Sequence, residues 1–136
     1  MRLTEDEQVW VGAQLEAAER FVADYGSGKG GAGLAALDHA WASWLDRQSV
    51  DPEDPDAIIN AVAVALGQAL VDAVDEFAWV TVYQDGDTDL GVSGLPALDV
   101  LIFPADLVAK EYEAKAQTFL ERTRDTLVAE VAEIRG

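Results

Sequence analysis

The sequence predicts an α+β fold: a three-stranded antiparallel meander packed against a buried helix, with other helices around it. An apolar helix is expected at 55–74, three short strands follow it, and a proline-led helix follows the last strand. The length of 136 residues suits a single domain. We divide it into a helical N-terminal part over 1–47 and an α-β-β-β-α core over 55–134.

The helix at 55–74 is predicted from its first turn and its apolar composition. Asp54 and Asp56 place carboxylates at the start, where Pro55 costs no hydrogen bond. The following residues are apolar almost all the way round. The stretch is shorter than the ~20 residues of a membrane span and lacks a basic flank. We therefore expect a core helix buried on most sides.

Strand signals follow this helix. Residues 77–83 alternate aromatic side chains with small or β-branched ones, which is typical of a strand covered on both faces. Asp85 and Gly86 can supply the positive φ angles of a hairpin turn. Residues 90–93 then form the return strand, and the apolar run at 100–103 predicts a third, well-buried strand.

Three further helices complete the prediction. Thr4 and Glu7 form a capping box at the start of the first helix, which we expect to end at Gly26. A second helix is expected at 34–47. The last helix is expected to begin near 105 and to extend to about 134. A bend in so long a helix stays open, but no internal proline or glycine locates one.

Two motifs resemble binding loops but lack required positions. The glycine-rich segment 26–33 has Gly30 after Lys29 where a phosphate-binding loop needs Ser or Thr, so we predict a flexible connector. The Asp85–Asp89 segment has the alternating carboxylates of a calcium loop. It lacks that loop's later glycine and glutamate, which predicts a solvated turn.

Composition restricts the chemistry that the chain can perform. The sequence has no cysteine and a single histidine, His39, which leaves no thiolate, no cysteine metal site and no second imidazole. We predict no catalytic residue, no metal site and no cofactor. The N-terminus lacks the apolar run of a signal peptide, so a cytoplasmic location is the expectation.

Charge restricts the partners. The formal net charge of −17 disfavours nucleic acids and anionic membranes through repulsion, and it favours a basic protein as partner. A homodimer, formed through Trp41 and Trp44 or through the last helix, stays open.

Six residues are candidates for contact with a ligand or partner. Four tryptophans in a chain of this size indicate a large aromatic core, with a partner or ligand groove as the alternative. Asn60 and Gln68 are polar positions on the buried helix and could be structural amides or ligand contacts. With one cation of the last helix, the candidates are Trp41, Trp44, Asn60, Gln68, Trp79 and Lys110.

Several of these positions carry a resemblance to a known family. The resemblance runs over about 37–113 and rests on Asn60, Gly67, Gln68 and Leu70, on 79–82, on 90–92 and on Phe103–Glu113. In these residues the chain resembles a family of small uncharacterised bacterial proteins defined only as a domain of unknown function. The resemblance implies no activity, so no catalytic residue is carried over.

The function that we predict is that of a non-enzymatic binding or adaptor protein. Toxin-neutralising proteins and acidic secretion chaperones are analogies at the level of fold and charge. Two alternatives stay open: a small-ligand-binding protein with a Trp-lined pocket, and an enzyme that uses carboxylates and Lys110. A concave pocket that holds Asn60, Gln68, Trp79 or Lys110 would favour either alternative.

Overall fold

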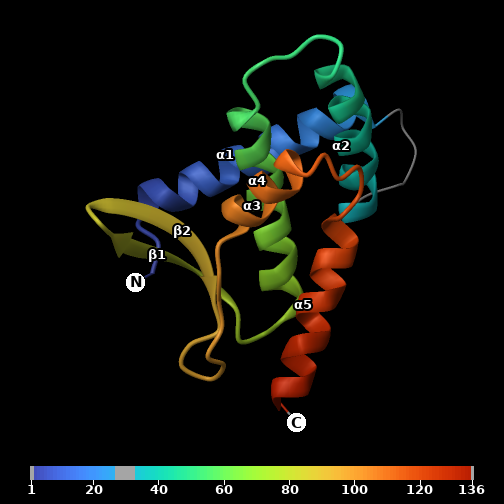
Figure 1. Cartoon of the computed structure of the whole chain (residues 1–136). Coiled ribbons are helices and arrows are strands. Elements are labelled where there is room, and N and C mark those ends of the chain that lie inside the picture. The colour runs from blue at the N-terminus through green and yellow to red at the C-terminus, as the bar shows by residue number, and fades with distance from the viewer. Residues whose placement is uncertain (1, 27–32, 136) are drawn as a thin grey trace.

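The computed structural model describes residues 2–26 and 33–135, and it confirms the α+β prediction (Figure 1). The glycine-rich connector predicted at 26–33 falls mostly outside the described residues. The elements in chain order are α1 (Glu5–Tyr25), α2 (Leu34–Gln48), α3 (Asp56–Ala73), β1 (Ala78–Gln84), β2 (Asp87–Ser93), β3 (Leu101–Ile102), α4 (Pro104–Glu113) and α5 (Leu120–Arg135).

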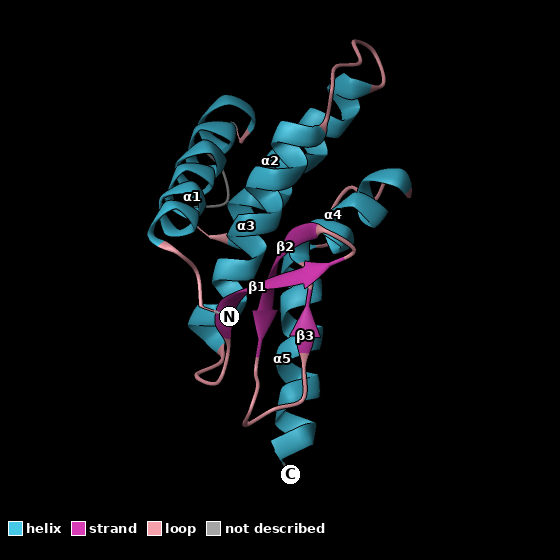
Figure 2. Ribbon diagram, turned by 90° about the vertical axis from the view of Figure 1, so that its left-hand side faces the viewer, coloured by secondary structure: helices cyan, strands magenta, loops and turns pink. Residues whose placement is uncertain are grey.

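The sheet is the predicted antiparallel meander in the order β1-β2-β3. Asp85 and Gly86 both have positive φ angles, 51° and 83°, as a tight hairpin turn requires. In the register of β1 and β2, Trp79 faces Val92 and Thr81 faces Leu90. Figure 2 shows the strands on one side of the molecule with the helices behind them.

Helix α3 lies at the centre of the fold and contacts α1, α2, α4, α5 and the first two strands. By length and composition it is the one helix in the described part of the chain that could cross a membrane. Here its apolar side chains face neighbouring elements, the setting of a core helix. Asp54 accepts a hydrogen bond from the backbone N–H of Asp56 at 3.0 Å, so its carboxylate stabilises the first turn as predicted.

Buried side chains form two clusters. One joins β2 and β3 to α5 and to the end of α3. The other, which we call the aromatic cluster, joins α1, α2, α3 and α4 to the start of α5; its rings are Phe21, Tyr25, Trp41, Trp44, Tyr112 and Phe119. The centroids of the Trp41 and Trp44 rings lie 5.1 Å apart.

The prediction of one helix over 105–134 is wrong. Helix α4 ends at Glu113, Lys115 adopts a positive φ of 57°, and α5 starts at Leu120. The cause is a carboxylate from another helix. The buried Asp38 side chain accepts hydrogen bonds from the backbone N–H groups of Phe119 and Leu120, at 2.9 and 2.8 Å, and so caps a new helix start.

Candidate functional site: an acidic aromatic pocket

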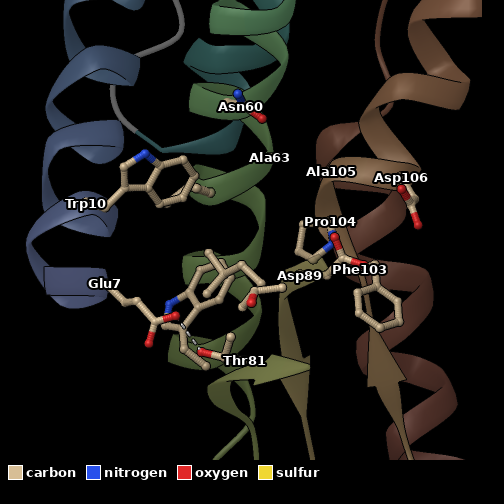
Figure 3. A pocket seen from close by; sticks show the side chains of 14 residues that line it. Glu7, Trp10, Asn60, Ala63, Thr81, Asp89, Phe103, Pro104, Ala105 and Asp106 are labelled. Atoms are coloured by element: carbon tan, nitrogen blue, oxygen red, sulfur yellow. Dashed lines mark hydrogen bonds between the residues drawn. The ribbon is translucent and has the colours of Figure 1, made fainter. Parts of the chain in front are cut away.

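A pocket of about 400 Å³ lies between α1, α3, the β1–β2 hairpin and the start of α4 (Figure 3). Its polar lining residues are Glu7, Asn60, Thr81, Thr88, Asp89 and Asp106. Its apolar lining residues are Trp10, Ala63, Val64, Trp79, Leu90, Phe103, Pro104 and Ala105. We refer to this site as the acidic pocket, since among the described residues no Lys, Arg or His lines it.

The first turn of α1 places a fixed carboxylate at the pocket. Glu7 completes the predicted capping box: its Oε1 accepts from the Thr4 backbone N–H at 2.8 Å. Its Oε2 accepts from the Thr81 hydroxyl of β1 at 2.9 Å, drawn as a dashed line in Figure 3. The Thr4 backbone bond, followed by the Thr81 bond, lowers the pKa of Glu7 below its ordinary value. Glu7 therefore joins α1 to the sheet as an anion.

Trp10 provides the exposed aromatic surface of the pocket. It lies three residues after Glu7, so the two side chains share one face of α1. In Figure 3 the Trp10 indole projects from α1 towards α3. The side chain keeps 43% of its surface exposed. A large indole surface is thus available to a ligand at this site.

Trp79 lies deeper in the pocket and is held by α3. A Cβ atom on Gly67 would overlap the Trp79 ring, so the ring packs directly on the helix backbone. The indole N–H donates to Oε1 of Gln68 at 3.0 Å, and the Gln68 amide donates to Asp72 at 2.9 Å. Three polar groups in a row thereby fix the orientation of the ring.

Two further carboxylates have no such partner. Asp89 of β2 and Asp106 in the first turn of α4 both line the pocket and are exposed. In the described part of the chain, neither side chain makes a hydrogen bond or an ion pair. The pocket therefore offers two free anionic groups beside aromatic surface.

The structure separates the six predicted contact residues. Asn60 and Trp79 line the acidic pocket, as both alternative functions, ligand binding and catalysis, required. Gln68 lines a different, shallower depression between α1, α2 and α3, and its amide is engaged by Trp79 and Asp72. Lys110 is exposed on α4, outside the acidic pocket.

Trp41 and Trp44 belong to the large aromatic core that the sequence indicated, so their place among the candidate partner or ligand contacts needs correction. Their exposed fractions are 0% and 1%, so both belong to the aromatic cluster. Their indole N–H groups are satisfied within the fold, by the Ala116 carbonyl at 2.9 Å and the Glu53 carboxylate at 3.3 Å. Both side chains are therefore enclosed within the fold of the one chain.

Sequence reasoning missed most of the pocket. Glu7 was identified only as a cap, and Trp10 was not distinguished from the other tryptophans. The available signal was their spacing, a carboxylate and an indole three residues apart on one helical face. No comparable sequence pattern identified Asp89, because the segment around it was predicted to be a solvated turn.

Within the described residues, no group of three or more His, Asp or Glu side chains is arranged to hold a metal ion. The alternating carboxylates of the hairpin are exposed and diverge in role: Asp89 lines the pocket, whereas Asp85 and Asp87 do not. What the pocket can do chemically is to attract and hold a cation against an aromatic surface.

Comparison with known proteins gives one match. The model of the family described as "Domain of unknown function (DUF3806)" matches residues 38–121, more than half of the chain. No curated protein and no solved structure matches. The matched segment begins at Asp38 and ends at Glu121, whose backbone N–H donates a hydrogen bond to the Asp38 carboxylate at 3.1 Å. Glu7 and Trp10 of the acidic pocket precede the matched segment. The chain belongs to the DUF3806 family.

Proposed function

We propose that this protein is a non-enzymatic binding protein that holds a basic partner protein at the acidic pocket. The observation that carries the proposal is the lining itself. Three carboxylates, Glu7, Asp89 and Asp106, line the same pocket as the exposed Trp10, with no basic residue among the described lining residues. Exposed aromatic surface combined with unpaired charge is typical of the anchoring points of protein interfaces.

The charge of the whole chain supports the same proposal. A net charge of −17 on 136 residues produces a field that attracts cations and speeds their encounter with the surface. No basic side chain is among the described lining residues of the pocket. Arg124 on α5, which lies outside the pocket, pairs with Glu121 and Asp125.

The pocket chemistry favours binding over catalysis. Glu7 and Thr81 are arranged as a base and a hydroxyl, but the hydrogen bonds that lower the pKa of Glu7 also make it a weak proton acceptor. Thr81 is buried and donates its proton inward. Neither group is suited to activate a nucleophile at neutral pH.

The volume of the pocket favours a second candidate, the binding of a small organic cation. About 400 Å³ falls within the range of roughly 300–1,000 Å³ of small-molecule sites. An aromatic amine or a quaternary ammonium compound would use the same carboxylates and indoles. This candidate function would be favoured if free amines bound with an affinity equal to that of basic peptides.

The test is equilibrium binding of a fluorescent basic peptide of mixed Lys and Arg, at rising salt, to wild type and to two double variants. Asp89→Asn with Asp106→Asn removes the free pocket charges. Glu130→Gln with Glu133→Gln removes the same charge from exposed positions of α5.

At about 0.1 M salt we expect the pocket variant to bind about tenfold more weakly than wild type and the α5 variant to bind less than about twofold more weakly, since exposed charges farther apart than the Debye length of about 10 Å are largely screened. Equal losses of affinity in the two variants would mean that the peptide is bound by general charge attraction, and would contradict the proposed site. Equal affinity for a neutral peptide would contradict the proposed partner.

A further inference from the structure

We propose that the outer edge of β1 binds an extended basic segment of the partner as an added antiparallel strand, in the place where Arg2 now pairs with Val80. This inference rests on the proposed function and specifies how the partner is held beside the acidic pocket. It follows from three observations: an edge strand without protecting residues, a basic residue already paired with that edge, and acidic residues at both ends of the strand.

The backbone of β1 faces outwards at alternate residues. The sheet order β1-β2-β3 gives β1 a neighbouring strand on one side only. Gln84 lies opposite Asp87 across the two-residue turn, so the backbone groups of Gln84 face β2. Because this direction alternates along a strand, the backbone N–H groups of Thr81 and Tyr83 point away from β2. The outer edge therefore presents donors and acceptors to a further strand.

The sequence of β1 lacks the residues that usually prevent a sheet edge from pairing. Residues 78–84 contain no charge, no proline and no glycine, although 26% of the chain is charged. Charges, proline and bulges are the common protection of edge strands. The Tyr83 side chain is 69% exposed and offers an aromatic surface to a residue on an adjacent strand. This edge is thus suited to strand addition.

The N-terminal segment of the chain shows which kind of strand fits this edge. Arg2 forms an isolated antiparallel bridge with Val80, and no other residue in the part of the chain that the structure describes pairs with the outer edge of β1. In Figure 1 this segment lies beside β1. A single bridge contributes little stability, so a longer strand can displace it. The N-terminal segment thereby competes with the partner for the same edge.

The charge around β1 selects a basic strand. The exposed Asp75 precedes β1, and the exposed Asp85 and Asp87 follow it, so carboxylates stand at both ends of the edge. The net charge of −17 repels a second copy of this chain and attracts a basic segment. Thr81 lines the acidic pocket, so the side chains of an added strand on the same face of the sheet lie on the side of the pocket. The edge and the pocket thus form one binding surface.

The test compares a blocked seven-residue peptide of alternating arginine and valine with the same peptide N-methylated at every backbone amide. The two peptides carry the same charge and side chains, but the methylated peptide cannot donate backbone hydrogen bonds to a sheet edge. By calorimetry we expect the unmodified peptide to bind at least about tenfold more tightly. At saturation it should also slow hydrogen exchange of the Tyr83 amide by about tenfold or more.

A pair of variants tests the same edge from the side of the protein. Tyr83→Pro removes the outward N–H, and an edge strand tolerates proline where its N–H faces solvent. Tyr83→Ala is the matched control, because it removes the same ring and keeps the N–H. We expect Tyr83→Pro to bind the unmodified peptide about fivefold more weakly than Tyr83→Ala does. Circular dichroism and urea unfolding establish that each variant is folded; if Tyr83→Pro does not fold, the methylated peptide tests the pairing on wild type.

The outcomes separate this inference from the proposed function. Equal affinity of the two peptides, with unchanged exchange at Tyr83, would contradict strand addition, while the double variant at Asp89 and Asp106 would still test the proposed pocket. Binding that is lost on N-methylation but is the same in that double variant would support strand addition and contradict the proposed pocket. A peptide of alternating glutamate and valine that binds as tightly as the basic one would contradict the selection of a basic strand. A dimer in sedimentation that the basic peptide does not dissociate, with the Tyr83 amide already protected, would assign the edge to a second copy.

Discussion

The aromatic cluster and the acidic pocket each contain two tryptophans and differ in what surrounds them. In the aromatic cluster, Trp41 and Trp44 of α2 are enclosed among rings from α1, from α4 and from the segment before α5, and their N–H groups bond to the fold itself. In the acidic pocket, Trp79 is only half-buried and Trp10 is exposed, and the same pocket is lined by carboxylates without partners. The same residue type thus serves stability in one region and recognition in the other.

The difference between the two regions shows which tryptophan side chains are still able to contact a ligand. A buried indole whose N–H is hydrogen-bonded within the protein contributes to folding and offers no surface to a ligand. An exposed indole beside free charges keeps that capacity for a ligand. We therefore expect substitutions in the aromatic cluster to change the free energy of unfolding, and substitutions in the acidic pocket to change binding.

The largest effect is expected for Trp41→Ala. It opens a cavity in the aromatic cluster and orphans the Ala116 carbonyl, which should lower the free energy of unfolding by about 3–5 kcal/mol. Trp10→Ala is the matched truncation at the exposed site and should cost less than about 1 kcal/mol. Urea unfolding measures both. Similar losses for the two variants would remove the distinction between the regions.

The next largest effect is expected for Asp38→Ala. The variant leaves the first N–H groups of α5 without their acceptor beside the aromatic cluster, and we expect a loss of about 3 kcal/mol. Asp54→Ala removes a single, exposed capping bond of α3 and should cost less than about 1 kcal/mol. Hydrogen exchange should also become faster at the start of α5. An intact, protected α5 in Asp38→Ala would mean that another group ends the α4 segment.

Gly67→Ala examines the support of the acidic pocket. The added methyl group overlaps the Trp79 ring and must displace it, at a cost of about 1–3 kcal/mol in unfolding free energy. Gly12→Ala is the control, because no atom lies within 4 Å of a Cβ on this helical glycine; it should stabilise the protein by up to about 1 kcal/mol. If both substitutions stabilise the protein, the Trp79 ring is not packed directly on the backbone of α3.

The smallest effect concerns the bond between Glu7 and Thr81. Thr81→Val removes one of the bonds that lower the pKa of Glu7, so this pKa should rise towards its ordinary value of 4.5. A lowered folded-state pKa stabilises the protein above the unfolded-state pKa, and this stabilisation is lost as pH falls through the folded-state value. The stability difference between wild type and variant should therefore be largest near neutral pH and shrink in acid.

NMR titration of the Glu7 side chain, together with urea unfolding at several pH values, measures this effect. Thr88→Val is the control, because Thr88 lines the pocket without a bond to Glu7. A Glu7 pKa that is the same in wild type and Thr81→Val would mean that the bond is not formed in solution.

Local signals were sufficient for much of the fold. The capping box at Thr4 and Glu7, the turn at Asp85 and Gly86, and the proline start of α4 each depend on residues a few positions apart. The apolar composition of α3 likewise predicted its central place. Such features are visible in sequence because helix caps and hairpin turns form from neighbouring residues.

The candidate site could be predicted only in part. Asn60, Trp79, Trp41 and Trp44 were all candidate contact residues. Asn60 and Trp79 line a pocket, whereas Trp41 and Trp44 are buried. The sequence of α2 alone does not show how completely Trp41 and Trp44 are buried, because the rings that pack on them come from α1, from α4 and from the residues before α5.

By itself the sequence determined the strong negative charge, the apolar core helix, the hairpin and the meander. Only the tertiary structure decided where the last helical segment divides and which tryptophan remains exposed. The physical reason is distance along the chain: Asp38 caps a helix 81 residues away, and Glu7 meets Thr81 across 74 residues. Contacts of this kind depend on packing of the whole chain, and they convert scattered carboxylates and indoles into one acidic pocket.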